Sequence, residues 1–121
     1  MPVAKVLVVD DSRTELMFLS DLLRQNGMQV RTAEGAEAAM LSLAEDVPDL
    51  ILLDVVMPGK NGFQLTRALQ RSPQYSGIPI ILCSSKDQET DRVWGLRQGA
   101  RDYVTKPVDA VTLLNKIRAL G

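Results

Sequence analysis

Five polar side chains stand directly after hydrophobic segments, and together they offer carboxylates, a hydroxyl and an ammonium. Asp10 and Asp11 follow the aliphatic run VLVV, and Asp54 ends the similar run LILLD. Ser84 follows IPIILC, and Lys106 follows the short segment DYVT. Three carboxylates held close together repel one another unless a cation neutralises them, and Mg²⁺ does so while keeping positions for phosphate oxygens. The set predicts a magnesium site for phosphoryl transfer, in which the ammonium neutralises phosphoryl oxygens.

Each of these residues also has an ordinary structural explanation. Asp11 and Ser12 are typical helix-capping residues, and Asp54 is suited to anchoring its own loop. Ser84 alone is typical of a turn, and Lys106 alone is typical of an exposed surface. These explanations are weaker for the whole set, because all of the positions follow strands that would be neighbours in one sheet. Ligands bind beyond the carboxyl ends of such strands.

Short aliphatic runs alternate with helical repeats along the chain, and this order predicts the elements that position the side chains. Strands are expected where the runs lack polar alternation, at residues 3–9, 28–33, 50–54, 78–83 and 102–105. Helices are expected between Ser12 and Gly27, at 35–46, 63–71 and 87–98, and after Asp109. Ser12 with Glu15 forms a capping-box pattern at the start of the first helix. The helix at 87–98 is less clearly amphipathic, so we expect one side of it to be available to a partner.

This alternation predicts an α/β fold with a doubly wound, five-stranded parallel sheet in the order 2-1-3-4-5. In that order the winding direction reverses between the first and third strands, and the crevice beyond their carboxyl ends is the expected ligand site. Asp10, Asp11 and Asp54 fall at this point.

Composition limits the classes of function. The chain has 121 residues, of which 45% are hydrophobic and 24% are charged, so we expect a single globular domain over residues 1–121. The net charge is −1 and the sequence contains no cluster of Lys and Arg residues, which is evidence against nucleic-acid binding. No apolar run approaches the ~20 residues that span a bilayer, so we expect no membrane insertion and a cytoplasmic protein. With no histidine and one cysteine, Cys83, which we expect to be buried, common zinc and thiol–imidazole chemistries are excluded.

The motifs together resemble the receiver domain of two-component response regulators over the whole chain. The resemblance rests on Asp10-Asp11, on LLDVVMPGKNG around Asp54, on Ser84 after IPIILC, and on Tyr103 followed by Lys106-Pro107. It implies a flavodoxin-like or CheY-like (βα)5 fold. The segment KDQETDRVWGLRQGARDYVTKPVD further resembles the single-domain, PilH-like regulators of type IV pilus twitching systems.

The resemblance implies a role for each acidic residue. Asp54 is expected to be the phosphoacceptor, taking a phosphoryl group from a phosphohistidine on a sensor histidine kinase. Asp10 and Asp11 are expected to position Mg²⁺, with Asp54 and the backbone carbonyl of Val56 completing the protein ligands.

It also implies a conformational switch. Lys106 is expected to pair with the phosphoryl oxygens and Ser84 to hydrogen-bond to one of them. Tyr103 is expected to turn inward when Ser84 moves. The face formed by the fourth helix, the fifth strand and the fifth helix would then bind a downstream protein target differently after phosphorylation. The resemblance implies that this target controls type IV pilus twitching or chemotaxis-like motility. The expected catalysis is limited to self-catalysed phosphoryl transfer and autodephosphorylation.

Three other functions remain open at this point. The chain is also compatible with a phosphate sink, or with a binding module that works without phosphorylation. A magnesium phosphatase of the haloacid-dehalogenase type also forms an aspartyl-phosphate on an α/β sheet. Such an enzyme normally has a second aspartate two residues past the nucleophile, where this chain has Val56.

Overall fold

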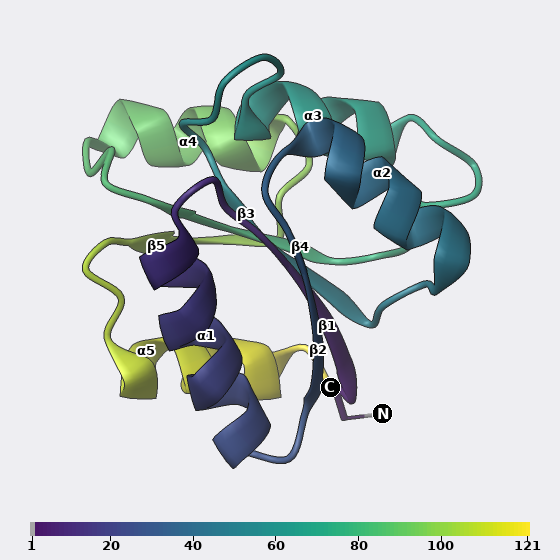
Figure 1. The fold of residues 1–121 in the computed structure, drawn as a ribbon. Helices are drawn as coiled ribbons and strands as arrows, with labels where there is room; N and C mark the ends of the chain where they lie inside the picture. Colours follow the sequence, from purple (N-terminus) through teal and green to yellow (C-terminus); the bar gives the residue numbers. More distant parts are fainter. Residues whose placement is uncertain (1) are drawn as a thin grey trace.

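The computed structural model describes residues 2–121, which form a five-stranded parallel sheet with helices on both faces (Figure 1). The strand order is β2-β1-β3-β4-β5, as predicted from the sequence. The strands are β1 (Lys5–Val9), β2 (Gln29–Ala33), β3 (Leu50–Asp54), β4 (Ile80–Ser84) and β5 (Asp102–Thr105). The helices are α1 (Arg13–Gln25), α2 (Ala36–Glu45), α3 (Gly62–Gln70), α4 (Glu89–Arg97) and α5 (Ala110–Ala119).

Two hydrophobic clusters hold the helices against the sheet. Helices α1 and α5 cover one face, and α2, α3 and α4 cover the other (Figure 1). Successive side chains of a strand point to opposite faces, so Leu53 and Leu82 pack under α2 to α4 while Leu52 and Ile81 pack under α1 and α5. Strands β3 and β4 are buried along their whole length, which explains their unbroken aliphatic sequences. None of the helices within residues 2–121 has the length and hydrophobicity that crossing a bilayer requires.

The fourth strand differs from the prediction at both ends. It was expected at 78–83, but β4 starts later and includes Ser84. Ile78 instead donates its backbone N–H to the carbonyl of Tyr75 and so belongs to the turn that precedes the strand. Pro79 has no N–H to donate to the sheet. The shift places Ser84 inside the last position of a buried strand, where its hydroxyl is held more firmly than in a loop.

The first strand and the fourth helix also differ from their predicted bounds by two residues or more, whereas the second strand and the second and third helices differ by one residue at one or both ends. The first strand begins later than predicted, because the backbone N–H groups of Ala4 and Lys5 both donate to a carboxylate oxygen of Asp49, each at 2.9 Å. The fourth helix is shorter than the predicted range 87–98, since Gln88 is its N-cap residue. These differences leave the sheet order unchanged.

Local caps set where the helices begin. The Oγ of Ser12 accepts a hydrogen bond from the backbone N–H of Glu15 at 3.3 Å. The backbone N–H of Ser12 donates to Asp10 and not to the Glu15 carboxylate, so the reciprocal bond is absent from the described residues. The capping box predicted there is therefore only half formed. A complete capping box, which the sequence analysis missed, joins Asn61 and Gln64 through bonds of 2.8 and 2.9 Å. It starts α3 just after the loop that follows Asp54.

Candidate functional site

The structure brings the three predicted acids together at the carboxyl edge of the sheet. Asp10 directly follows β1, and Asp54 is the last residue of β3, the strand that pairs with β1 in parallel. Carboxylate oxygens of Asp10, Asp11 and Asp54 all lie within 4.8 Å of one another. Asp10 and Asp54 are buried, whereas Asp11 is exposed. The group has two fixed acids and one that faces solvent.

The ammonium of Lys106 neutralises the two buried acids. Its Nζ donates to Oδ2 of Asp10 at 2.7 Å and to Oδ1 of Asp54 at 3.3 Å, and the lysine side chain is only 18% exposed. The backbone N–H of Lys106 donates to the carbonyl of Ser84 at 2.8 Å, which anchors the residue beside β4. The peptide bond between Lys106 and Pro107 is cis. One ammonium therefore contacts carboxylates that belong to two different strands.

The pKa values of this group follow from burial and from the neighbouring charges. Burial raises the pKa of Asp54, the charge of Asp10 raises it further, and Lys106 opposes both effects. Burial alone would lower the pKa of Lys106, but its hydrogen bond to Asp10 and the negative charges of Asp54 and Asp10 outweigh burial, so the pKa is raised. Lys106 therefore stays protonated in a site that holds three carboxylates, and the site retains a negative surplus.

The donor atoms fit a hard divalent cation. All three acids offer oxygen ligands, which Mg²⁺ prefers. Within residues 2–121, no group donates a hydrogen bond to the carboxylate of Asp11 or to the backbone carbonyl of Val56. The side chain of Val56 is exposed and apolar, so only its backbone carbonyl can act as a ligand. The negative surplus and the free oxygens together meet the requirements of a magnesium site.

Ser84 and Tyr103 are joined through the backbone of Lys86. The Oγ of Ser84, which is fully buried, accepts from the N–H of Lys86 at 3.1 Å, and the hydroxyl of Tyr103 donates to the carbonyl of Lys86 at 2.8 Å. Tyr103 already lies inward in this structure, with 6% of its surface exposed. Burial raises the pKa of its phenol, and the neighbouring Ser84 hydroxyl opposes that effect. This link through Lys86 was not predicted, because backbone groups of a loop give no signal in the sequence.

Gly62 is a second residue whose role the sequence analysis missed. A Cβ atom at this position would overlap the backbone carbonyl of Asp54 and lie 2.8 Å from the Cα of Val55. The N–H of Gly62 donates to the carbonyl of Val55 at 2.8 Å, and Thr66 donates its hydroxyl to the carbonyl of Gly62 at 2.7 Å. The absence of a side chain lets α3 start directly against the end of β3. The sequence showed this glycine only as part of a turn.

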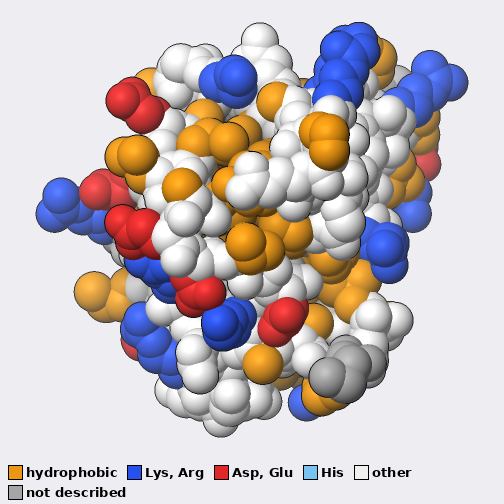
Figure 2. Space-filling view, turned by 90° about the vertical axis from the view of Figure 1, so that its right-hand side faces the viewer, with side chains coloured by type: hydrophobic (Ala, Val, Ile, Leu, Met, Phe, Trp, Pro, Cys, Tyr) orange, Lys and Arg blue, Asp and Glu red, His pale blue; other side chains and the backbone are white. Residues whose placement is uncertain are grey.

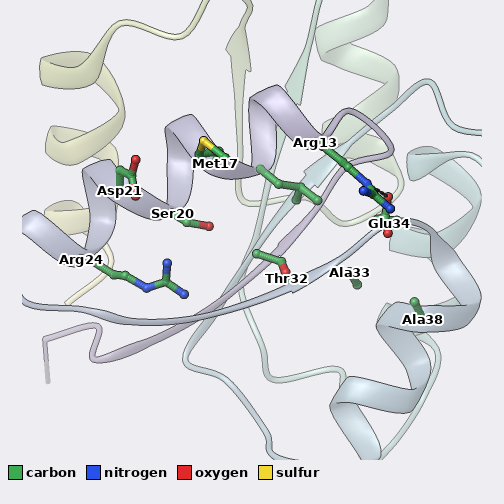
Figure 3. A pocket seen from close by; sticks show the side chains of 10 residues that line it. Arg13, Met17, Ser20, Asp21, Arg24, Thr32, Ala33, Glu34 and Ala38 are labelled. Atoms are coloured by element: carbon green, nitrogen blue, oxygen red, sulfur yellow. Dashed lines mark hydrogen bonds and ion pairs between the residues drawn. The ribbon is translucent and has the colours of Figure 1, made fainter.

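A hollow of about 500 Å³ lies between α1, β2 and the start of α2, and none of the three clustered acids lines it (Figure 3). Arg13 and Glu34 meet at one end of it through an ion pair of 3.3 Å, and Arg24 reaches into it from α1 (Figure 3). The hydroxyl oxygen of Ser20 is buried and has no hydrogen-bond partner among residues 2–121. No nucleophile with an adjacent base, and no group of three acids, lies in this part of the described structure. The groups needed for chemistry therefore belong to the acid cluster and not to this hollow.

Comparison with known families agrees with the geometry. The family model described as "Response regulator receiver domain" matches residues 6–118, which include all five strands except one residue of β1 and all the acids of the cluster. The chain belongs to this family. The resemblance noted in the sequence is thus confirmed, and the protein is a receiver domain of the two-component response-regulator class.

The chain is similar to individual response regulators in sequence and in structure. The chain is 51% identical to Protein PilH of Pseudomonas aeruginosa over 117 residues, which cover 97% of each protein. It is 41% identical to the Response regulator PleD of Caulobacter vibrioides, but there it spans only 26% of the relative's length. Among solved structures, the chemotaxis response regulator CheY4 of Vibrio cholerae superposes with a TM-score of 0.90 at 30% identity and covers 98% of this chain and 99% of CheY4. The flavodoxin-like, CheY-like fold predicted from the sequence is therefore confirmed.

Proposed function

We propose that this receiver domain accepts a phosphoryl group on Asp54 from a phosphohistidine of a sensor histidine kinase. The observation that carries the proposal is the environment of Asp54. Its carboxylate ends a buried central strand, lies beside two further acids, and is contacted by the Lys106 ammonium at 3.3 Å. Membership of the receiver family supports the same assignment.

In the proposed reaction, a carboxylate oxygen of Asp54 forms the new bond to phosphorus. The bond between phosphorus and the histidine nitrogen of the donor breaks, and the nitrogen leaves with the electron pair. The product is a mixed anhydride. Lys106 holds positive charge at the place where negative charge accumulates on the phosphoryl oxygens, and this is the main assistance that such a transfer needs. Water later attacks the phosphorus atom of the phosphoaspartate, which releases inorganic phosphate and regenerates the carboxylate. In this proposal the protein catalyses only its own phosphorylation and dephosphorylation.

Mg²⁺ is the cofactor that the site would take, held by Asp10, Asp11, Asp54 and the backbone carbonyl of Val56. When bound, it neutralises phosphoryl oxygens and aligns the donor with Asp54. Asp10 is already oriented for this role, because its Oδ1 accepts from the backbone N–H of Ser12 at 2.9 Å. Asp11 remains free to turn toward the ion.

Ser84 and Tyr103 are the proposed switch. The Ser84 hydroxyl accepts from the backbone N–H of Lys86 and keeps its own proton to donate to a phosphoryl oxygen. A movement of Ser84 toward the phosphoryl group would therefore draw on the backbone of Lys86, whose carbonyl holds the Tyr103 hydroxyl. Phosphorylation therefore acts on the loop between β4 and α4 and on the ring of Tyr103 together. We propose that the α4–β5–α5 face carries this change to a downstream protein.

The similarity to PilH supports a role in type IV pilus twitching or in a related chemotaxis-like pathway, with residues 1–121 forming a single receiver domain. Whether the output is an active effector or a phosphate sink depends on the partner. Equal affinity of a target for unphosphorylated and phosphorylated protein would favour the sink or a binding module that works without phosphorylation.

The proposal is tested by incubating the protein with acetyl phosphate, with and without Mg²⁺, and following intact mass. We expect the mass of one phosphoryl group to appear only with Mg²⁺, and to be absent from Asp54→Asn. An Asp54→Asn variant that gains the same mass would contradict the assignment. Sustained hydrolysis of a generic phosphomonoester would instead favour the phosphatase of the haloacid-dehalogenase type. The sequence argues against that enzyme, because Val56 occupies the place of its second aspartate.

A further inference from the structure

A cationic hollow of about 370 Å³ lies between the last turns of α3 and α4. The acid cluster lies at the opposite end of the strands. Helices of a parallel α/β sheet run opposite to its strands, so the last turns of α3 and α4 lie near the amino ends of the strands. The hollow is lined by Arg67, Gln70, Arg71, Trp94, Arg97 and Gln98. The lining contains three arginines and no acidic residue, although the whole chain has a net charge of −1. The positive charge is therefore local.

These arginines lack the partners that usually explain surface charge. Arg67, Arg71 and Arg97 are exposed, and none of them forms an ion pair with another residue of the range 2–121. A basic residue in the last turn stabilises a helix through its dipole, which accounts for Arg67 and Arg97 singly. It does not account for their convergence, because Arg67 and Arg71 are four residues apart on one face of α3, where like charges destabilise. In Figure 2, Lys and Arg side chains lie along the upper edge of the face shown, and others are spread over its left and right sides.

Trp94 separates this hollow from an apolar neighbour. It is the only tryptophan of the chain and is 49% exposed. A second hollow, of about 260 Å³, shares Trp94 and Arg97 and is completed by Glu89, Thr90 and Val93. Val93 is also exposed, and Glu89 faces Arg92 at 3.8 Å. Exposed tryptophan beside arginine is characteristic of protein interfaces, where these residues contribute most of the binding energy.

The packing of α4 leaves this side of the helix unpartnered. Gly95 is its only buried residue, and a Cβ there would lie 2.7 Å from Cδ1 of Leu82 and 3.3 Å from the ring of Tyr103. The helix thus rests closely on β4 and β5 through a residue without a side chain. The side chains of Val93 and Trp94 remain exposed, and Trp94 lines the hollow that α4 shares with α3.

We propose that the groove between α3 and α4 binds an acidic peptide segment of a partner protein. Carboxylates of the segment occupy the hollow of Arg67, Arg71 and Arg97, and an aliphatic side chain packs on Trp94 and Val93. Two open hollows of different character, placed side by side, match alternating acidic and apolar side chains along a chain. This surface lies on the α3 side of α4 and is distinct from the α4–β5–α5 face.

A phage-displayed library of random peptides provides the test, since it favours no particular partner. We expect the selected peptides to be rich in Asp and Glu, to contain an aliphatic residue, and to shift the fluorescence of Trp94. Arg97→Glu should weaken binding by about tenfold, and added salt should weaken it as well. Arg118→Glu is the matched control, because it reverses the charge of an exposed arginine in the last turn of α5. This variant should bind the peptides with an affinity within about twofold of the wild type.

The proposal is overturned if no peptide is enriched, if the enriched peptides have no acidic surplus, or if Arg118→Glu weakens binding as much as Arg97→Glu. It is also overturned if ATP, GDP or inorganic phosphate displaces the peptides and gives the same fluorescence change, since the groove would then be a site for small anions. Binding is measured on unphosphorylated protein and repeated on Asp54→Asn. The result is therefore independent of whether Asp54 accepts a phosphoryl group.

Discussion

Replacing Lys106 by methionine removes the cation that the two buried acids share. Asp10 is 2% exposed, and Lys106 itself is 18% exposed, so the ion pair is largely shielded from water. Removing one partner of a buried pair leaves an uncompensated charge and costs about 3–5 kcal/mol. We expect the lower end, about 3 kcal/mol of unfolding free energy without Mg²⁺, because Lys106 keeps some contact with solvent.

The assay is urea unfolding at neutral pH, in EDTA and then in saturating Mg²⁺. At a hundred times its dissociation constant, a ligand of the folded state adds about 2.7 kcal/mol of stability. Lys106→Met should gain more from Mg²⁺ than the wild type does, since no ammonium competes for the carboxylates. Burial already raises the pKa of Asp54, so protonation of its carboxylate should also reduce the deficit of the variant as the pH falls through that raised pKa.

Lys116→Met is the matched control for this experiment. Lys116 also forms a two-point ion pair, to both carboxylate oxygens of Asp102 at 3.1 Å, but the two side chains are 31% and 29% exposed. Its loss should cost less than about 1 kcal/mol. The reasoning is refuted if Lys106→Met loses no more stability in EDTA than Lys116→Met, or if Mg²⁺ stabilises both variants equally.

Three further predictions concern the elements that support the site. Asp49→Asn should be less stable than the wild type above about pH 4, because two backbone N–H groups lower the pKa of Asp49 in the folded state. The difference in unfolding free energy should vanish as the pH falls through that lowered pKa. A difference that persists in acid would contradict this prediction. Gly62→Ala should cost about 2–3 kcal/mol in urea unfolding, since its Cβ would overlap the carbonyl of Asp54, and full stability would show that α3 can move away freely. Asn61→Ala should cost about 1 kcal/mol through loss of the cap on Gln64, measured by thermal unfolding, with Asn61→Asp retaining most of the stability.

The positions of the acids could be predicted because they depend on repeated, local patterns. The run LILLD has the composition of a strand buried on both faces, and the observed bounds of β3 match the expected ones. Parallel strands end at the same edge of a sheet, so the approach of Asp10 to Asp54 follows from the strand order alone. The same reasoning brought Lys106 to this edge, although it is 96 residues from Asp10 in the chain.

Features that depend on close tertiary contact could not be predicted. The link from Ser84 to Tyr103 runs through backbone atoms of Lys86, and no side-chain pattern reports such a link. The need for glycine at position 62 arises from its contact with Asp54, a residue of another element. The start of β4 was misplaced because Ile78 has a strand-like side chain but takes part in a turn. In each case the feature depends on a contact that the pattern of neighbouring residue types does not reveal.

The most direct test of the account is the location of the phosphoryl group. The wild-type protein is treated with acetyl phosphate and Mg²⁺, the acyl phosphate is trapped with hydroxylamine, and the modified residue is identified by peptide mass spectrometry. We predict a hydroxamate at Asp54 alone, with none formed when EDTA replaces Mg²⁺. Modification of Asp10 or Asp11 in place of Asp54, or no modification in protein that has bound Mg²⁺, would contradict the central claim.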